Sequence, residues 1–251
     1  MSADATDLGN QATFLARVRA ALGRGPLSPE QAAAVLPRGL EPAAQERLAR
    51  IRARSYQERL ALVEQMRQAA ALVKHQVQCV ASPAEAAAAI ASIAAEAAPE
   101  WAEGKSLCAW DHELLRPLDL AGLCANQGME FYLAGEDPAA LRSAAAQACL
   151  GVTAADLCVA ETGTVLLHSG PGRPRAVSLL PSIHVAVARL DAVVADFPEL
   201  YAALAEREHT DGLPGSWVFV SGPSKTGDIE AVMVHGVHGP CATHLIVVAG
   251  Q

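Results

Sequence analysis

The feature that most constrains the fold of this chain is an alternation of short β-type runs and capped helices over residues 76–248. The Val-, Ile- and Leu-rich runs are separated by Ala-rich stretches that begin at Ser82-Pro83 and Asp137-Pro138. A Ser or Asp cap followed by proline at the first helical position is a typical helix start. Strands and helices in alternation favour an α/β domain with a layered, mostly parallel sheet flanked by helices.

The same patterns predict where the elements lie. Strands are expected at residues 76–80, 106–110, 129–133, 157–160, 165–167, 183–188, 217–220 and 244–248, and helices at residues 83–98, 138–150, 196–207 and 224–234. Apolar residues at helical spacing predict one long helix from Pro42 to Val73. An amphipathic helix at residues 11–22 and a short Ala-rich helix, opened by a capping box at Ser28 and ending at Pro37, precede it. Residues 1–40 are therefore expected to form an N-terminal helical appendage, and residues 41–251 the α/β domain.

Composition narrows the class of protein. Hydrophobic residues make up 51% of the 251 residues and aromatic ones only 4%, which suits an aliphatic core and argues against a disordered chain. No run of about 18 apolar residues lacks a charge, so we expect no membrane span. The first ten residues, MSADATDLGN, lack the basic and apolar regions of a secretory signal. We therefore expect a cytoplasmic protein.

Charge and cysteine spacing bear on partners and cofactors. Residues 1–80 hold 11 Lys/Arg against 7 Asp/Glu, which leaves 8 against 20 in the rest of a chain with net charge −8. An acidic body makes nucleic acid an improbable partner, because phosphate binding needs a concentrated positive field. The six cysteines contain no C-x-x-C pair. We therefore expect no disulfide framework and no cluster or structural zinc bound by this chain.

Two stretches, Gly151–His184 and Ser221–Pro240, are more specific than the Ala-rich remainder. Parallel sheets bind ligands at the carboxyl ends of their strands, where loops and helix N-termini converge. The second stretch follows an expected strand and precedes an expected helix, so it predicts an anion site; a capped helix without a ligand is the alternative. A second Gly-rich loop, Ser169–Arg173, ends in the positively charged side chain of Arg173. The ligand-binding candidates from these two loops are Ser169, Gly170, Gly172, Arg173, Ser221, Gly222, Ser224, Lys225 and Thr226.

Two further side chains, those of Glu161 and His184, could take part in catalysis. Glu161 ends a β-type run before a Thr-Gly turn and is a candidate nucleophile or general base; it could instead bond only to the turn. His184 is a candidate base or orienting residue, with a buried core histidine as the alternative. The other ligand-binding candidates are Thr162, Gly163, Thr164, His235 and His238. The two imidazoles three residues apart resemble metal ligands, but no third ligand lies near them in sequence, so we predict no metal site.

The motifs together resemble a known family. GVTAADLCVAETGTVLLHSGPG, SLLPSIH, SGPSKTGDIE and HGVHGP occur in an order and spacing similar to those of the LUD domain of the lactate-utilisation protein C family. The opening FLARVRAALGR is also similar to the start of such proteins. The resemblance implies a fold similar to the sugar-isomerase, ribose-phosphate isomerase and CoA-transferase group.

The resemblance also implies a function. It suggests an accessory or substrate-handling subunit for oxidation of L-lactate to pyruvate, with a small anionic substrate and partner proteins that carry the iron–sulfur clusters. By analogy with CoA transferases, Glu161 stands near the position of their glutamate nucleophile. Two alternatives remain: a free-standing enzyme that acts through Glu161 on a small phosphorylated or CoA-linked substrate, and a ligand sensor without catalysis.

Overall fold

The computed structural model describes residues 5–23, 25, 28, 30–31, 39–100, 102–135, 137–211, 215–228 and 232–250. The chain divides into two compact units, Met1–Leu40 and Glu41–Gln251. The first unit contains helix α1 (Ala5–Ala21), which includes most of the expected amphipathic helix. Ser28 and Gln31 exchange the two bonds of the expected capping box, at 2.9 and 3.1 Å. The rest of the Ala-rich helix expected there lies outside the described residues.

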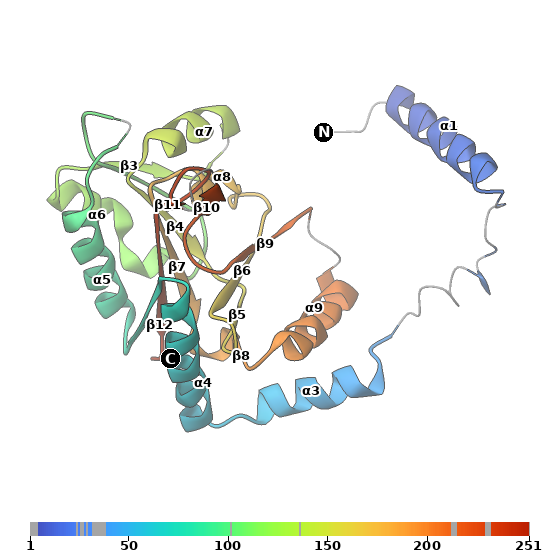
Figure 1. Ribbon diagram of the computed structural model, residues 1–251, viewed down its shortest axis with the longest axis horizontal. Coiled ribbons are helices and arrows are strands. Elements are labelled where there is room, and N and C mark those ends of the chain that lie inside the picture. The colour runs from blue at the N-terminus through green and yellow to red at the C-terminus, as the bar shows by residue number, and fades with distance from the viewer. Residues whose placement is uncertain are drawn as a thin grey trace. The chain divides into compact units, whose positions relative to one another are not determined.

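The second unit is built on a six-stranded sheet in which every neighbouring pair is parallel (Figure 1). The strands, in their order across the sheet, are β1 (His75–Val80), β12 (Ala242–Val248), β7 (Ile183–Arg189), β4 (Leu150–Ala154), β2 (Ser106–Ala109) and β3 (Glu130–Leu133). The expected α/β fold with a largely parallel sheet is confirmed. β4 was not expected, because all five of its residues are buried and show no alternation of polar and apolar side chains.

A second sheet packs on one face of the first. It consists of β8 (Val193–Val194), β5 (Leu157–Val159), β6 (Thr164–His168) and β9 (Trp217–Val220). Alternate residues such as Cys158 and Val165 join the core of the large sheet, whereas Leu157 and Leu166 pack with Leu200 in a separate cluster beneath α9 (Phe197–Asp211). Because successive side chains of a strand point to opposite faces, the second sheet forms a layer between the large sheet and α9.

The remaining helices connect the strands. They are α3 (Pro42–Ala53), α4 (Tyr56–Leu72), α5 (Pro83–Glu96), α6 (Leu120–Asn126), α7 (Pro138–Gln147) and α8 (Ala176–Leu179), with short 3-10 turns η1 (Arg116–Leu118) and η2 (Leu190–Ala192). The prediction of one helix from Pro42 to Val73 is wrong. Arg54 and Ser55 adopt extended backbone angles, and Ser55 caps α4 by accepting a bond from Glu58 N at 3.3 Å. Glu58 accepts one from Ser55 N at 2.7 Å, which completes a capping box.

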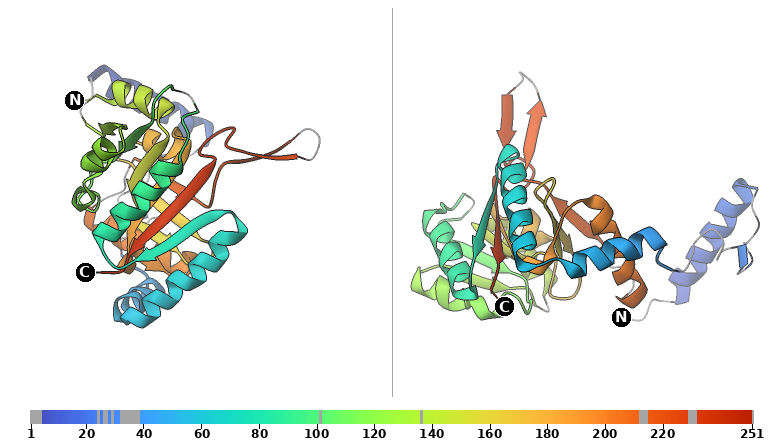
Figure 2. Two further views of the ribbon diagram at one scale, coloured as in Figure 1. Left: turned by 90° about the vertical axis from the view of Figure 1, so that its left-hand side faces the viewer. Right: turned by 90° about the horizontal axis from the view of Figure 1, so that it is seen from below.

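The prediction of a helix at residues 224–234 is also wrong. The chain forms an antiparallel hairpin there, from β10 (Lys225–Asp228) and β11 (Val232–His235). Figure 2 shows the hairpin extending away from the rest of its unit. Backbone bonds from Ser224 N to Pro240 O and from Gly236 N to Ser224 O, at 2.9 and 3.0 Å, fix its base. In the part of the chain that the structure describes, no helix has the length and apolar character needed to cross a membrane.

Candidate functional site

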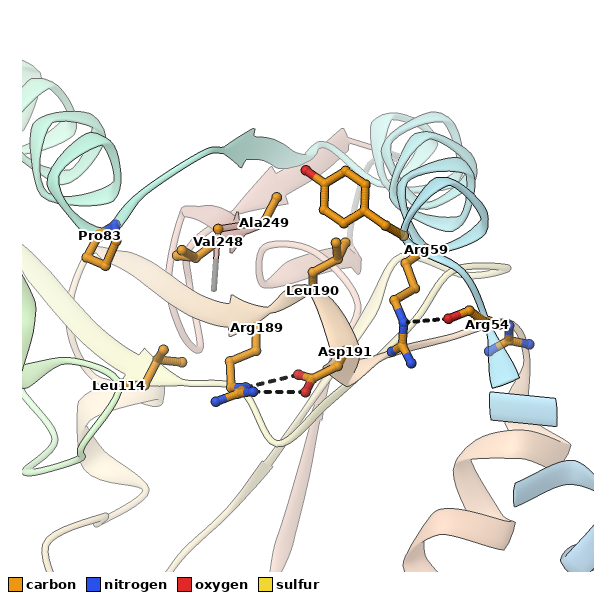
Figure 3. A pocket seen from close by; sticks show the side chains of 11 residues that line it. Arg54, Arg59, Pro83, Leu114, Arg189, Leu190, Asp191, Val248 and Ala249 are labelled. Atoms are coloured by element: carbon orange, nitrogen blue, oxygen red, sulfur yellow. Dashed lines mark hydrogen bonds and ion pairs between the residues drawn. The ribbon is translucent and has the colours of Figure 1, made fainter. Parts of the chain in front are cut away.

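A cavity of about 710 Å³ lies where β1, β12 and β7 end and their connections begin (Figure 3). Val248, Ala249 and Gly250 line it at the end of β12, and Arg189 at the end of β7. Tyr56 and Pro83, the first residues of α4 and α5, also line it. The cavity therefore occupies the edge of a parallel sheet at which α/β proteins bind their ligands.

Three arginines and one carboxylate give the cavity its charge. Arg189 donates from Nε and Nη2 to the two carboxylate oxygens of Asp191, each at 3.0 Å. This pairing raises the pKa of Arg189 and lowers that of Asp191. Arg59 donates from Nε to Arg54 O at 3.3 Å and from Nη2 to Ile51 O at 3.2 Å. Formally the lining carries three positive charges against one negative charge.

The side chain of Arg54 is 15% exposed, whereas that of Arg189 is 69% exposed. Arg54 pairs through Nη2 with Glu199, whose side chain is 6% exposed. Its Nη1 is buried and has no hydrogen-bond partner among the described residues. A buried guanidinium nitrogen without an acceptor is costly, and an anion in the cavity could supply one.

Helix-capping residues determine where α4 and α5 start beside the cavity. The break at Arg54-Ser55 starts α4 beside the cavity. Helix α5, which Ser82 caps by accepting from Glu85 N at 3.2 Å, starts at Pro83 on the opposite wall (Figure 3). The positive ends of two helix dipoles therefore face the same space as the arginines. The capping residues Glu58 and Glu85 balance part of that charge.

A second group of polar residues lies at the same edge of the sheet, after β4 and β6. Asp156 Oδ1 lies 2.5 Å from His168 Nδ1, and Asp156 Oδ2 accepts from His168 N at 2.8 Å. Arg207 of α9 also donates to Asp156 Oδ1, at 3.3 Å. In the tautomer that donates from Nδ1 to this carboxylate, the ring presents an Nε2 lone pair. The side chain of His168 is 20% exposed and that of Asp156 only 10%.

The loop from Ser169 to Pro174 brings a cation to this group. Asp111 N donates to Gly172 O at 3.1 Å and Trp110 Nε1 to Pro174 O at 2.9 Å, which joins the loop to the end of β2. His112 follows directly, and its Nδ1 accepts from Leu114 N at 3.1 Å. Burial is the main cause that lowers the pKa of His112, and the positive charge of Arg173 lowers it further. We call Asp156, His168, His112 and Arg173 the imidazole group.

The structure brings some of the predicted site residues together. Gly170 and Arg173 exchange backbone bonds at 3.2 and 2.9 Å, and Gly172 adopts φ of 70°. Ser169 Oγ bonds to Ser216 Oγ at 2.6 Å. The bond from Asp111 N to Gly172 O places this Gly-rich loop at the carboxyl edge of the large sheet.

The Ser221–Pro240 stretch lies elsewhere. Gly222 approaches α4 where it leads into β1: a Cβ on Gly222 would lie 2.5 Å from Val73 O. Ser224 bonds to Pro240, just before β12 begins. Both contacts are at the amino edge of the large sheet, opposite the loop of Arg173. The strand before this stretch is β9 of the second sheet, so the rule for carboxyl ends of parallel strands did not apply to it.

The residues around Glu161 form a third location. Three hydroxyl groups form a hydrogen-bonded chain there. Thr164 Oγ1 lies 2.7 Å from Thr162 Oγ1 and 2.8 Å from Ser221 Oγ. Gly163 has φ of 65°, and a Cβ there would lie 2.8 Å from Ala70 Cα of α4. Glu161 itself is exposed, and its backbone N donates to Ala195 O at 3.0 Å. It does not line the cavity, and its catalytic role stays a prediction.

His184 is fully buried on β7 and bonds to Thr153 Oγ1 through Nε2 at 2.9 Å. Thr243 lies beside it in register on β12, and His75 lies beside Thr243 on β1, with His75 Nδ1 2.6 Å from Thr243 Oγ1. These residues form a buried polar row across the sheet. The placement agrees with the alternative of a core histidine, and a catalytic role for His184 stays a prediction.

The remaining candidates belong to the hairpin region. Lys225 and Thr226 lie in β10 rather than at a helix start, so the helix N-terminus on which the predicted anion site depended does not exist. The side chain of His235 lies outside the described residues. His238 is exposed.

Sequence reasoning missed the arginines of the cavity and most of the imidazole group. In the sequence alone, the run of arginines before residue 60 indicates a solvated or partner-binding helix face. The capping pair Ser55 and Glu58, visible in the sequence, was the signal that the helix breaks there and could have placed Arg54 and Arg59 at a helix start. Asp156 carried no signal, because its partner His168 becomes a neighbour only through pairing of β5 with β6.

With this geometry in place, comparison with known proteins identifies the class. The sequence profile of the LUD domain matches residues 63–248, which is most of the chain. The chain therefore belongs to the LUD domain family, and the membership expected from its motifs is confirmed.

Individual relatives are consistent with this class. The chain is 33% identical over 144 residues to lactate utilization protein C of Shouchella clausii, covering 57% of this chain and 62% of that one. It is 44% identical over 110 residues to lactate utilization protein C of Halalkalibacterium halodurans, covering 41% and 46%. The chain thus matches about half the length of these relatives. A solved structure of a DUF162 family protein from Deinococcus radiodurans has a TM-score of 0.49 and 22% identity, covering 78% of this chain and 99% of that one.

Proposed function

We propose that this protein is a cytoplasmic, substrate-handling subunit of L-lactate utilisation, which holds lactate at the imidazole group while partner proteins carry the iron–sulfur clusters. The names of its relatives, lactate utilization protein C, support the pathway. The observation that carries the site is the Asp156–His168 pair, with Oδ1 and Nδ1 2.5 Å apart, in the same loop system as Arg173.

The chemistry of lactate fits these groups. Oxidation to pyruvate removes two electrons and two protons from a hydroxyl-bearing carbon beside a carboxylate. Arg173 would pair with the carboxylate, and the Nε2 lone pair of His168 would accept the hydroxyl proton. Asp156 keeps the required tautomer and stabilises the imidazolium that forms, as a carboxylate partner does for other catalytic histidines. The two electrons and the second proton would pass to an acceptor on the partner proteins.

The alternative enzyme, acting through Glu161, has one observation in its favour: Glu161 is exposed, as a nucleophile must be. It would act on a phosphorylated or CoA-linked substrate. A covalent intermediate trapped on Glu161 would favour it over lactate handling.

Calorimetric titration with L-lactate tests the proposal. Arg173→Gln is expected to weaken binding about tenfold or more, because a charge-assisted contact is lost. Arg175→Gln is the matched control, since Arg175 is exposed two residues away and contacts the ligand in no part of the proposal. His168→Asn is expected to retain lactate binding but to abolish lactate-dependent electron transfer in the complex reconstituted with the partner proteins. Unchanged lactate binding in Arg173→Gln, or full electron transfer in His168→Asn, would contradict the proposal.

A further inference from the structure

We propose that the cavity of Arg54, Arg59 and Arg189 binds a phosphate ester of mononucleotide size, a ligand distinct from lactate. This inference is independent of the proposed function, because it rests on a different part of the sheet edge. The cavity lies over β1, β12 and β7, whereas the imidazole group follows β4, β6 and β2.

The charge of the cavity points to an anion. The chain as a whole carries 27 Asp and Glu against 19 Lys and Arg, yet among the described residues three arginines and one carboxylate, Asp191, line this cavity. A second carboxylate, Glu199, pairs with Arg54 from outside the lining, so the arginines still outnumber the carboxylates. Among the described residues, Arg59 and Arg189 use Nε and Nη2 for internal bonds, which leaves Nη1 of each side chain. Arg54 likewise keeps a buried Nη1 without a partner. Three guanidinium groups therefore each retain a donor nitrogen.

The form of the anion follows from the number of donors. A carboxylate offers two oxygens and one negative charge, which a single guanidinium satisfies. A phosphate monoester offers three terminal oxygens and close to two negative charges. Three guanidinium donors and the N-termini of α4 and α5 match the second kind of ligand, because the dipole of a helix stabilises a phosphate near its N-terminus.

The size and the walls of the cavity specify the rest of the ligand. Its volume, about 710 Å³, lies within the range of roughly 300–1,000 Å³ typical of sites for drug-sized molecules. A three-carbon acid would fill a small part of it. Leu114, Leu190 and Val248 supply apolar surface, and Tyr56, which is 53% exposed, supplies an aromatic ring at the rim. Apolar walls with one aromatic ring suit a flat heteroaromatic group.

The test is calorimetric titration of the full chain with AMP, FMN, inorganic phosphate and adenosine. AMP or FMN is expected to bind, with adenosine and inorganic phosphate each at least about tenfold weaker, because each lacks half of the recognised structure. Arg189→Gln is expected to weaken binding of the ester about tenfold or more. Its side chain is 69% exposed and, among the described residues, forms its ion pair with Asp191 alone, so the variant should fold. Arg142→Gln, an exposed arginine of α7 away from the cavity, is the matched control.

Two further measurements separate the outcomes. Tyr56→Leu is expected to weaken AMP or FMN while leaving inorganic phosphate unchanged, which a purely electrostatic site would not show. L-Lactate binding is expected to be the same in Arg189→Gln and in the unmodified chain, so failure here and failure of the lactate proposal are distinguishable. The inference is overturned if neither ester binds at millimolar concentration, if inorganic phosphate binds as tightly as the esters, or if Arg189→Gln and Arg142→Gln behave alike.

Discussion

The buried polar row of His75 and His184 makes the stability of this protein sensitive to acid. Burial is the main cause that lowers the pKa of His75 to about 4 and that of His184 to about 3, and neighbouring histidines lower both further. In the unfolded chain the ordinary histidine pKa of about 6.5 applies. Between these values the unfolded chain binds protons that the folded protein does not. Stability is therefore complete above about pH 6.5 and is lost as the pH falls toward the folded values.

The size of the effect at moderate acidity follows from the unfolded pKa alone. At about pH 5 both folded pKa values lie below the solution pH, so each histidine stays neutral in the folded protein. Protonation of the unfolded chain over about 1.5 pH units then costs about 2 kcal/mol for each histidine. Together the two side chains account for about 4 kcal/mol of lost stability between about pH 7.5 and about pH 5, a large fraction of the stability of a typical domain.

Urea unfolding at the two pH values measures this loss, with His75→Asn and His184→Gln as the informative variants. The amides preserve a hydrogen-bonding atom near Thr243 and Thr153 and do not titrate. Each substitution is expected to shrink the difference in unfolding free energy between the two pH values by about 2 kcal/mol, whatever it does to stability at neutral pH. His238→Gln, at an exposed site, should leave that difference unchanged. A variant of His184 with an undiminished pH difference would refute the reasoning.

Three predictions concern local structure. Gly163→Ala is expected to destabilise the protein by about 1–3 kcal/mol in a urea titration, because its Cβ would lie 2.8 Å from Ala70 Cα at a φ of 65°. Gly104→Ala is the control in the same titration, because a Cβ added at Gly104 would meet no other described residue's atom within 4 Å, its chain neighbours aside. Ser55→Ala removes the cap of α4 and should cost about 1 kcal/mol by thermal unfolding, and a cost near zero would contradict the capping box. Ile90→Ala empties a fully buried position of α5 and should cost about 2–5 kcal/mol; a loss below about 1 kcal/mol would show that the site collapses around the smaller residue.

The large sheet was predictable because local signals determine most of it. Ser82-Pro83 and Asp137-Pro138 start α5 and α7 as expected, since these caps act within four residues of sequence. The hairpin at Lys225–His235 was not predictable in this way. Its Ser-Lys-Thr start and acidic first turn imitate a helix start, and only the backbone bonds of Ser224 to Pro240 and Gly236 show that the chain turns back.

The candidate site was less predictable than the fold. Arg173 and its Gly-rich loop could be proposed as site residues because the loop itself is distinctive in sequence. Arg54 and Arg189 are 135 positions apart (189 − 54) and share a cavity only because β1, β12 and β7 are neighbours in the sheet. No local sequence pattern predicts the order of the strands in the sheet. Charged residues on separate strand connections therefore cannot be assigned to one cavity from a single sequence.

The origin of the cavity lining has a consequence for how this domain can be redesigned. All three arginines and Tyr56 lie outside the strand interiors, on the α3–α4 connection, the start of α4 and the end of β7. Tyr56, Arg59 and Arg189 could therefore be randomised while the strands that build the core stay fixed. A library confined to those three positions would explore new ligands and would keep the Arg54–Glu199 pair, the capping box of Ser55 and Glu58, and buried Leu190 unchanged. The LUD domain is in this sense a scaffold whose chemistry can be exchanged separately from its architecture.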